Sequence, residues 1–340
     1  MWYGHLARHR QDACATSFTS EMEILYIAFY TITERSRFFT LLSKFFSLSL
    51  SSLSPMTRQT RPQNHLLLLL FPATIWLILF FVIPLLIVLL YSFLQADVYG
   101  GVKGIFTLEN YQRLFDEIYL NILARSLGMA TFTTLACLII GYPLAFFIAT
   151  RSPRWRGALL LLVVIPFWTN FLVRTYTWFV LLRNEGVINV VLESLQIINQ
   201  PLELLFTPFA VNIGLIYGYL PFMILPLYTT LERFNFSLIE AAQDLGANDW
   251  RTFRRVVLPL TVPGIISGSI LVFIPALGAF ITPDILGGAK TMMVGNLIQN
   301  QFMKSRDEPF GSALSMFLLV LVLIPILIYF RFSEEDQPLR

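Results

Sequence analysis

Apolar residues form long runs that recur along most of the chain, between residues 66 and 332. Each run has roughly 20 residues, the length that an α-helix needs to cross about 30 Å of hydrocarbon. The runs are continuous and do not alternate with polar residues, which favours helices over the strands of a membrane barrel. We predict about six membrane-spanning helices, at residues 66–94, 119–150, 157–182, 209–231, 262–286 and 311–332. The predicted fold class is all-α, a polytopic membrane protein.

Composition supports the same class and excludes others. Apolar residues make up 56% of the 340 residues and charged residues only 13%, against roughly 45–50% and about 25% in soluble domains. The net charge of +3 is too small to argue for nucleic acid. The two cysteines, Cys14 and Cys137, lie far apart, and none of the three histidines has metal-ligand spacing. We therefore expect no disulfide, no metal and no cofactor.

The basic residues predict how the spans are oriented. Three arginines and no acid lie between the second and third spans, and four arginines lie between the fourth span and the fifth. The intervening loops are richer in acids, and the fifth loop is the one exception. The positive-inside rule then places both termini in the cytoplasm. The residues used are Arg151, Arg154, Arg156, Arg233, Arg251, Arg254 and Arg255 on one side and Glu185, Glu193 and Glu203 on the other.

The first 55 residues differ from the rest because they are mixed in polarity and contain no long apolar run. Neither a continuous apolar core nor a small-residue cleavage site marks them as a secretory signal. We predict two parts: residues 1–55 as a poorly structured N-terminal extension and residues 56–340 as the transmembrane domain. Our hypothesis is that Met56 is the native start. A genuine cytoplasmic tail is the alternative, and the intact mass of the native protein distinguishes them.

The loop between the fourth and fifth spans, residues 233–261, is too long and too patterned for a plain turn. Ser237 and Glu240 have the spacing of a capping box, which predicts a helix start. Gly246 follows good helix formers and predicts a C′ glycine, while Asn248 can cap a second helix. We expect Pro259 to end that second helix before the fifth span. A helix–turn–helix on the cytoplasmic face results, and by physical pattern alone it could also be an amphipathic hairpin resting on the membrane.

Part of this loop resembles the EAA motif of ABC importer permeases. The matching positions are Glu240, Ala241, Ala242, Gly246, Leu258 and Pro259, and Val256 stands where the family usually has isoleucine. The resemblance implies that the loop contains a coupling helix that docks on a separate ATPase subunit. It carries that role to Glu240, Ala241, Ala242, Asp244, Gly246, Leu258 and Pro259.

Further stretches are similar to one subfamily, the spermidine/putrescine permeases. They are residues 106–111 (FTLENY), 141–145 (GYPLA), 165–170 (IPFWTN) and 287–290 (GGAK), and the resemblance covers residues 66–332. It implies a type I ABC importer permease architecture in the bacterial inner membrane. It also implies two ATP-binding subunits, a second permease subunit and an extracytoplasmic solute-binding protein as partners, with polyamines as the solute. An ABC permease for another small solute is the alternative.

No Gly-x-x-x-x-Gly-Lys-Ser/Thr occurs in the chain, so ATP hydrolysis is expected from other subunits rather than from this one. A secondary transporter needs ionisable residues deep in the membrane. The candidates in the predicted spans are Arg125, Arg174 and Asp284, and all three lie in the outer parts of their spans. A membrane-embedded enzyme needs clustered catalytic groups, and the sequence shows none.

Aromatic residues in the spans are candidates for a passage for polyammonium ions, because aromatic faces attract cations. The candidate translocation residues are Trp168, Tyr176, Trp178, Tyr217 and Asp284. The fifth span should be broken around residues 274–279, since Pro275 removes a backbone donor and Gly278 adds freedom.

Overall fold

The structure is a computed structural model that describes residues 64–97 and 100–335. The hypotheses about residues 1–55 and about Met56 as the native start lie outside the described residues. The chain divides into two compact units, Met1–Ile75 and Trp76–Arg340. The described part of the first unit, residues 64–75, belongs to helix α2, Asn64–Leu77.

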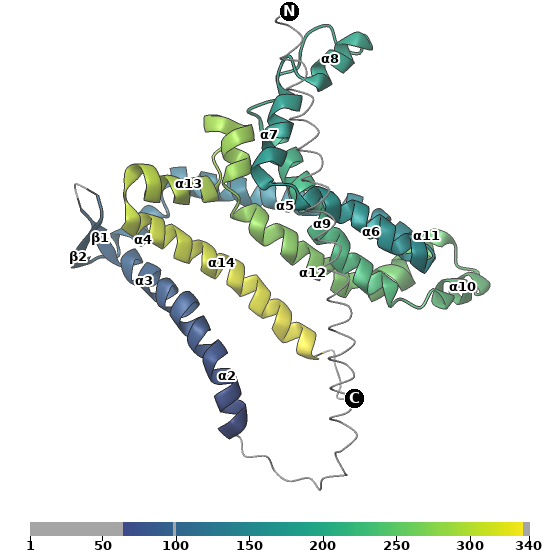
Figure 1. The fold of residues 1–340 in the computed structure, drawn as a ribbon, viewed down its shortest axis with the longest axis horizontal. Helices are drawn as coiled ribbons and strands as arrows, with labels where there is room; N and C mark the ends of the chain where they lie inside the picture. The colour runs from purple at the N-terminus through teal and green to yellow at the C-terminus, as the bar shows by residue number, and fades with distance from the viewer. Residues whose placement is uncertain (1–63, 98–99, 336–340) are drawn as a thin grey trace, which may run out of the picture. The chain divides into compact units, whose positions relative to one another are not determined.

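Helices dominate the second unit (Figure 1). Its main elements are α3 (Ile83–Ser92), α4 (Glu109–Arg113), α5 (Glu117–Ala149), α6 (Pro153–Trp168), α7 (Phe171–Leu182), α8 (Val187–Ser194), α9 (Pro208–Glu232), α10 (Ser237–Asp244), α11 (Asp249–Thr252), α12 (Leu258–Leu277), α13 (Val294–Asn300) and α14 (Glu308–Glu335). Short π-helical segments lie at Ile78–Val82, Phe253–Val257, Pro283–Gly287 and Gln301–Ser305. The predicted all-helical class is confirmed apart from one small β-ribbon.

That ribbon follows the first span, where sequence reasoning expected only a loop. Strands β1 (Leu94–Ala96) and β2 (Val102–Phe106) pair antiparallel. The buried side-chain amide of Asn110 donates to the backbone carbonyl oxygens of Ser92 and Leu94 at 3.1 and 2.8 Å. Because these bonds tie α4 to the end of α3 and to β1, the ribbon has a fixed place beside the first span.

Four helices among the described residues are long and apolar enough to cross a membrane: Phe71–Ser92, Glu117–Ala149, Pro208–Glu232 and Asp249–Leu277. A bent pair, Pro153–Trp168 with Phe171–Ser194, adds a fifth span if it is counted as one. The predicted sixth span falls in α14, where Glu308–Ile324 is a shorter apolar helix. The predicted positions of the spans therefore agree with the helices, and the third span needs a correction.

The third predicted span, residues 157–182, is broken rather than continuous. Its two arms meet at Thr169 and Asn170 with a bend of 87°. Thr169 has extended backbone (ψ 149°), and the side-chain oxygen of Asn170 accepts the amide of Leu172 at 2.8 Å. Since the Asn170 side chain caps a new helix, α7 starts in the middle of the apolar run.

The fifth span is interrupted at the place that Pro275 and Gly278 predict. Helix α12 ends at Leu277 with Gly278 as its C-cap, and a short π-helical segment follows at Pro283–Gly287. The Tyr219 hydroxyl donates to the carbonyl oxygen of Pro275 at 3.1 Å. The hydrogen bond attaches the last turn of α12 to α9.

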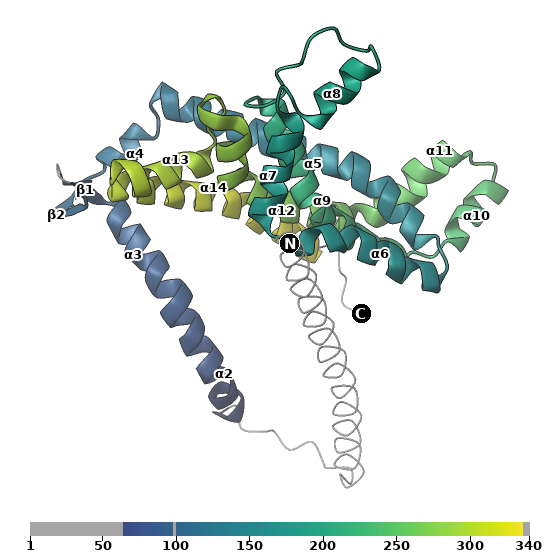
Figure 2. The same ribbon diagram turned by 45° about the horizontal axis from the view of Figure 1, so that its top comes forward.

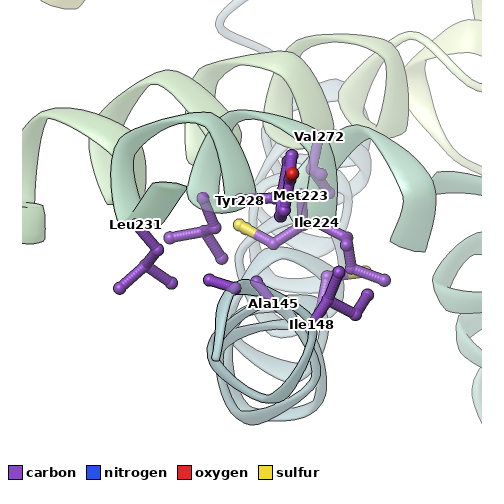
Figure 3. Close-up of a cluster of buried hydrophobic side chains, with 10 residues drawn as sticks. Ala145, Ile148, Met223, Ile224, Tyr228, Leu231 and Val272 are labelled. Carbon is purple, nitrogen blue, oxygen red and sulfur yellow. The ribbon is translucent and has the colours of Figure 1, made fainter. Parts of the chain in front are cut away.

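The core of the unit lies where α5, α9 and α12 pack together (Figure 3). Buried side chains from the three helices meet there, including Ala145, Met223, Leu231 and Val272. The buried face of α12 consists mainly of small residues, Thr261, Gly264, Gly268, Val272 and Ala276. Small residues at this spacing let helices approach closely in a membrane, where dispersion contacts replace the hydrophobic effect. In both Figure 1 and Figure 2, the β1–β2 ribbon and the α10–α11 hairpin lie at opposite ends of this unit.

Candidate functional site

The turn between α10 and α11 has the geometry that the sequence predicts. Gly246 has φ +81°. Its amide donates to the Gln243 carbonyl at 2.8 Å, and the Ala247 amide donates to the Ala242 carbonyl at 3.0 Å, which together form a Schellman motif. The Asn248 side chain then accepts the Arg251 amide at 2.9 Å and caps α11. Gly246 as C′ residue and Asn248 as N-cap are both confirmed.

The start of α10 differs from the predicted capping box. Ser237 is not the N-cap of α10; its hydroxyl and its backbone amide both donate to the Asn235 side-chain oxygen, at 2.8 and 3.1 Å. Asn235, two residues before the first residue of α10, therefore organises the helix start, because its side-chain oxygen accepts both hydrogen bonds from Ser237. The exposed Glu240 side chain is left free to face a partner.

The hairpin exposes apolar side chains that sequence reasoning did not single out. Leu245 is 90% exposed, Trp250 67% and Leu238 41%. Of the EAA positions, Glu240 and Ala241 are exposed and Ala242 is half-buried. Exposed apolar side chains grouped with small residues and two flanking acids, Glu240 and Asp244, are typical of a surface that binds another protein. An apolar residue directly before a C′ glycine is the signal that could have pointed to Leu245.

The sequence predicted that Leu258 and Pro259 end the second helix of the loop, and that prediction is wrong. Helix α11 continues through a π-helical segment, Phe253–Val257, into α12, and the Leu258 amide donates to the Phe253 carbonyl. A proline near a helix start has no amide to satisfy, and the wider π turn accommodates it. The hairpin is thus a direct extension of the fifth span.

Two sets of contacts fix the base of the hairpin on the core. The Trp250 ring stacks on Phe253 with centroids 5.8 Å apart, and Phe253 meets the edge of Tyr142 on α5 at 5.6 Å. The Tyr142 and Thr261 hydroxyls are 3.0 Å apart and hydrogen-bonded. On the other side, the ring of Phe236 contacts Phe146 of α5 at 6.1 Å. These contacts connect the hairpin to α5 and α12.

The candidate translocation residues are only partly brought together. The rings of Trp178 on α7 and Tyr217 on α9 are in contact at 5.6 Å. Trp168 is 76% exposed at the end of α6, and Tyr176 is 55% exposed on α7. Asp284 is exposed on the Pro283–Gly287 segment. Within the described residues, no group of three His, Cys, Asp or Glu side chains could hold a metal ion.

Comparison with known proteins identifies the family. The family model "Binding-protein-dependent transport system inner membrane component" matches residues 141–334, which include the α10–α11 hairpin. The spermidine/putrescine transport system permease protein PotB of Escherichia coli (strain K12) is 46% identical over 259 residues, covering 76% of this chain and 94% of that protein. PotB of Haemophilus influenzae is 48% identical over 259 residues, covering 76% of this chain and 91% of that protein.

A solved structure shares the fold. A chain of a bacterial ABC transporter involved in the import of the acidic polysaccharide alginate matches with a TM-score of 0.63 at 19% identity, covering 81% of this chain and 97% of that chain. The helical packing described above is therefore shared with a chain of that transporter. The chain belongs to the family of inner membrane components of binding-protein-dependent transport systems.

Proposed function

We propose that this chain is the membrane-spanning permease subunit of an ABC importer for polyamines, spermidine or putrescine. The observation that carries the proposal is the 46–48% identity to PotB proteins, which extends over 91–94% of their length. An ABC permease for another small solute is the alternative. The chain forms a passage and hydrolyses no ATP itself.

The partners follow from this role. Two ATP-binding subunits, a second permease subunit and a periplasmic solute-binding protein complete the importer. The α10–α11 hairpin is the surface that docks on an ATP-binding subunit, with contributions from Glu240, Ala241, Ala242, Asp244 and Gly246. Leu258 and Pro259 join that surface to α12, so that a movement of the ATPase reaches the fifth span.

The expected experiment on the solute uses cells that lack their own polyamine importers. Expression of this chain with its partner subunits should give energy-dependent uptake of labelled spermidine or putrescine. Excess unlabelled polyamine should suppress that uptake, and excess amino acid or sugar should not. Uptake of a different solute class without any polyamine uptake would favour the alternative permease.

Both termini lie in the cytoplasm in this proposal, together with the α10–α11 hairpin. Arg154 is exposed near the start of α6, and Glu193 is exposed near the end of α8. In right-side-out vesicles, Arg154→Cys should resist a membrane-impermeant thiol reagent until the membrane is opened. The matched variant Glu193→Cys should react at once. Labelling of Arg154→Cys from outside contradicts the orientation.

The passage runs beside the Trp178–Tyr217 pair. Both rings stand at the broken third span, and Tyr217 keeps 39% of its surface exposed. Aromatic faces attract ammonium groups without the strong hold of a carboxylate, which suits a passage whose specificity resides in the solute-binding protein. Trp168, Tyr176 and Asp284 remain candidates along the same passage.

A further inference from the structure

Arg174 is a buried cation in the middle of the protein's broken third span. It lies on α7 and is only 9% exposed. Its guanidinium carbon is 5.7 Å from the ring centre of Phe167, 5.4 Å from that of Phe171 and 5.9 Å from that of Tyr217. These distances are within the range of cation–π attraction, about 6 Å. Rings from α6, α7 and α9 therefore enclose the positive charge.

The charge of Arg174 is not neutralised inside the described part of the chain. The salt bridges found there are Lys103–Asp97, Arg113–Asp307 and Arg156–Glu232, and none involves Arg174. Arg174 is eight residues before the end of α7 at Leu182, roughly 12 Å along the helix axis. An ionisable side chain within a membrane-spanning segment is costly and commonly has a function there.

A second positive element lies close to Arg174. The break at Thr169 and Asn170 places the N-terminus of α7 inside the apolar run, and Arg174 follows within its first turn. A helix N-terminus carries a partial positive charge of about half an elementary charge. The positive charges of the guanidinium and of the helix end therefore reinforce each other, and the three aromatic rings hold the guanidinium in place.

Snorkelling does not account for Arg174. A snorkelling arginine extends its head group to water and keeps it exposed, whereas this side chain is 91% covered, as its 9% exposure implies. A purely structural cation is normally paired with an acid. The location of the charge next to Tyr217, behind the proposed passage, suggests an electrostatic task instead.

We propose that Arg174 is a fixed positive charge that makes the passage resist unpowered cation flow. The proposal rests on the proposed passage beside Trp178 and Tyr217. In a low-dielectric setting a fixed cation raises the barrier for any cation that passes nearby. A polyamine carries several charges and meets the largest barrier, so it moves only when the ATP-driven cycle rearranges the helices. Monovalent cations are excluded throughout.

Gly218 allows this charge to be cancelled without removing Arg174. It follows Tyr217 on α9, and a Cβ built there lies 3.9 Å from Arg174 Nη2, an ordinary contact distance. Gly218→Asp places a carboxylate beside the guanidinium, and Gly218→Asn places a neutral amide of the same shape. The pair separates charge from packing, because both variants add nearly the same volume.

The experiment measures ⁸⁶Rb⁺ influx into KCl-loaded proteoliposomes that contain the complete importer, at rest and during ATP hydrolysis. Arg174→Gln and Gly218→Asp should raise influx roughly 10-fold or more over the wild-type importer, a factor that one unit charge reaches from roughly 12 Å away at an effective dielectric constant of ~20. Arg174→Lys and Gly218→Asn should stay at the wild-type level.

The proposal is overturned if Arg174→Gln and Gly218→Asp assemble and remain as tight to ⁸⁶Rb⁺ as the wild type. Equal leakage through Gly218→Asp and Gly218→Asn also overturns it, since that result assigns the effect to packing. Should Arg174→Gln fail to assemble, the Gly218 pair decides alone. Labelled spermidine uptake by Trp178→Ala tests the passage separately: unchanged uptake places the passage elsewhere, whatever the ⁸⁶Rb⁺ result.

Discussion

Gly246→Val should abolish solute uptake while the permease stays inserted in the membrane. Gly246 has φ +81°, and a Cβ built there has no neighbour within 4 Å. The substitution therefore causes no collision, and its cost is backbone strain of roughly 1–2 kcal/mol for a non-glycine residue in a left-handed conformation. Relief of that strain breaks the hydrogen bonds that Gly246 and Ala247 donate to α10 and reorients α10 against α11.

The change is confined to an exposed turn, so membrane abundance measured by blot should match the wild type. Uptake of labelled polyamine should be lost, and the ATP-binding subunits should co-purify poorly or hydrolyse ATP without transport. Gly246→Asn is the matched control, because asparagine tolerates left-handed backbone, and it should retain most uptake. Normal abundance with normal uptake in Gly246→Val would show that the hairpin is not the coupling element.

The parts of this hairpin that the sequence predicts are those set by local backbone chemistry. Gly246 must follow the last turn of α10 because a left-handed residue is needed there, and Asn248 can cap α11 without any tertiary contact. The prediction that Ser237 caps α10 was wrong for an equally local reason. Asn235 and Ser237 are both capable caps, and the pattern gives no basis for preferring Asn235, whose side-chain oxygen takes both donors of Ser237.

Other features of the spans could not be predicted from the sequence. The third span has a continuous apolar pattern because Thr169 and Asn170 carry no charge, yet Asn170 starts a new helix there. The contact of Trp178 with Tyr217 and the enclosure of Arg174 require α7 and α9 to be placed side by side. Likewise, the sequence marks Pro259 as a helix end, whereas the π turn at Phe253–Val257 lets the helix continue.

Gly295→Ala should strongly reduce the amount of folded permease, although it adds a single methyl group. Gly295 lies in α13, whose first residues are buried, and it faces the backbone of Gly278 and Ala279 just after α12. A Cβ built there would be 2.5 Å from the carbonyl oxygens of both Gly278 and Ala279. Overpacking of this kind costs about 1–3 kcal/mol when side chains can yield, and here the obstacles are backbone atoms.

The surroundings of Gly295 leave little room for relief. The neighbouring Val294 amide donates to Ser126 Oγ at 2.8 Å, and the Asn296 side chain donates to the Phe280 carbonyl at 2.7 Å. Moving α13 away from the Gly278 and Ala279 backbone therefore strains two hydrogen bonds, one buried and one partly buried, each worth about 1 kcal/mol. We expect a lower thermal unfolding midpoint in detergent and reduced membrane abundance.

Gly128→Ala on α5 is the matched control for Gly295→Ala, because a Cβ built at Gly128 meets nothing within 4 Å. Alanine favours a helix interior over glycine by roughly 0.5–1 kcal/mol, so the unfolding midpoint of this control should stay equal or rise. If Gly295→Ala unfolded at the same temperature as Gly128→Ala, α13 would not be packed on the end of α12 as closely as the structure places it. The break in the fifth span would then be held by Gly278 and Pro275 alone, and bulk at residue 295 would leave transport unaffected.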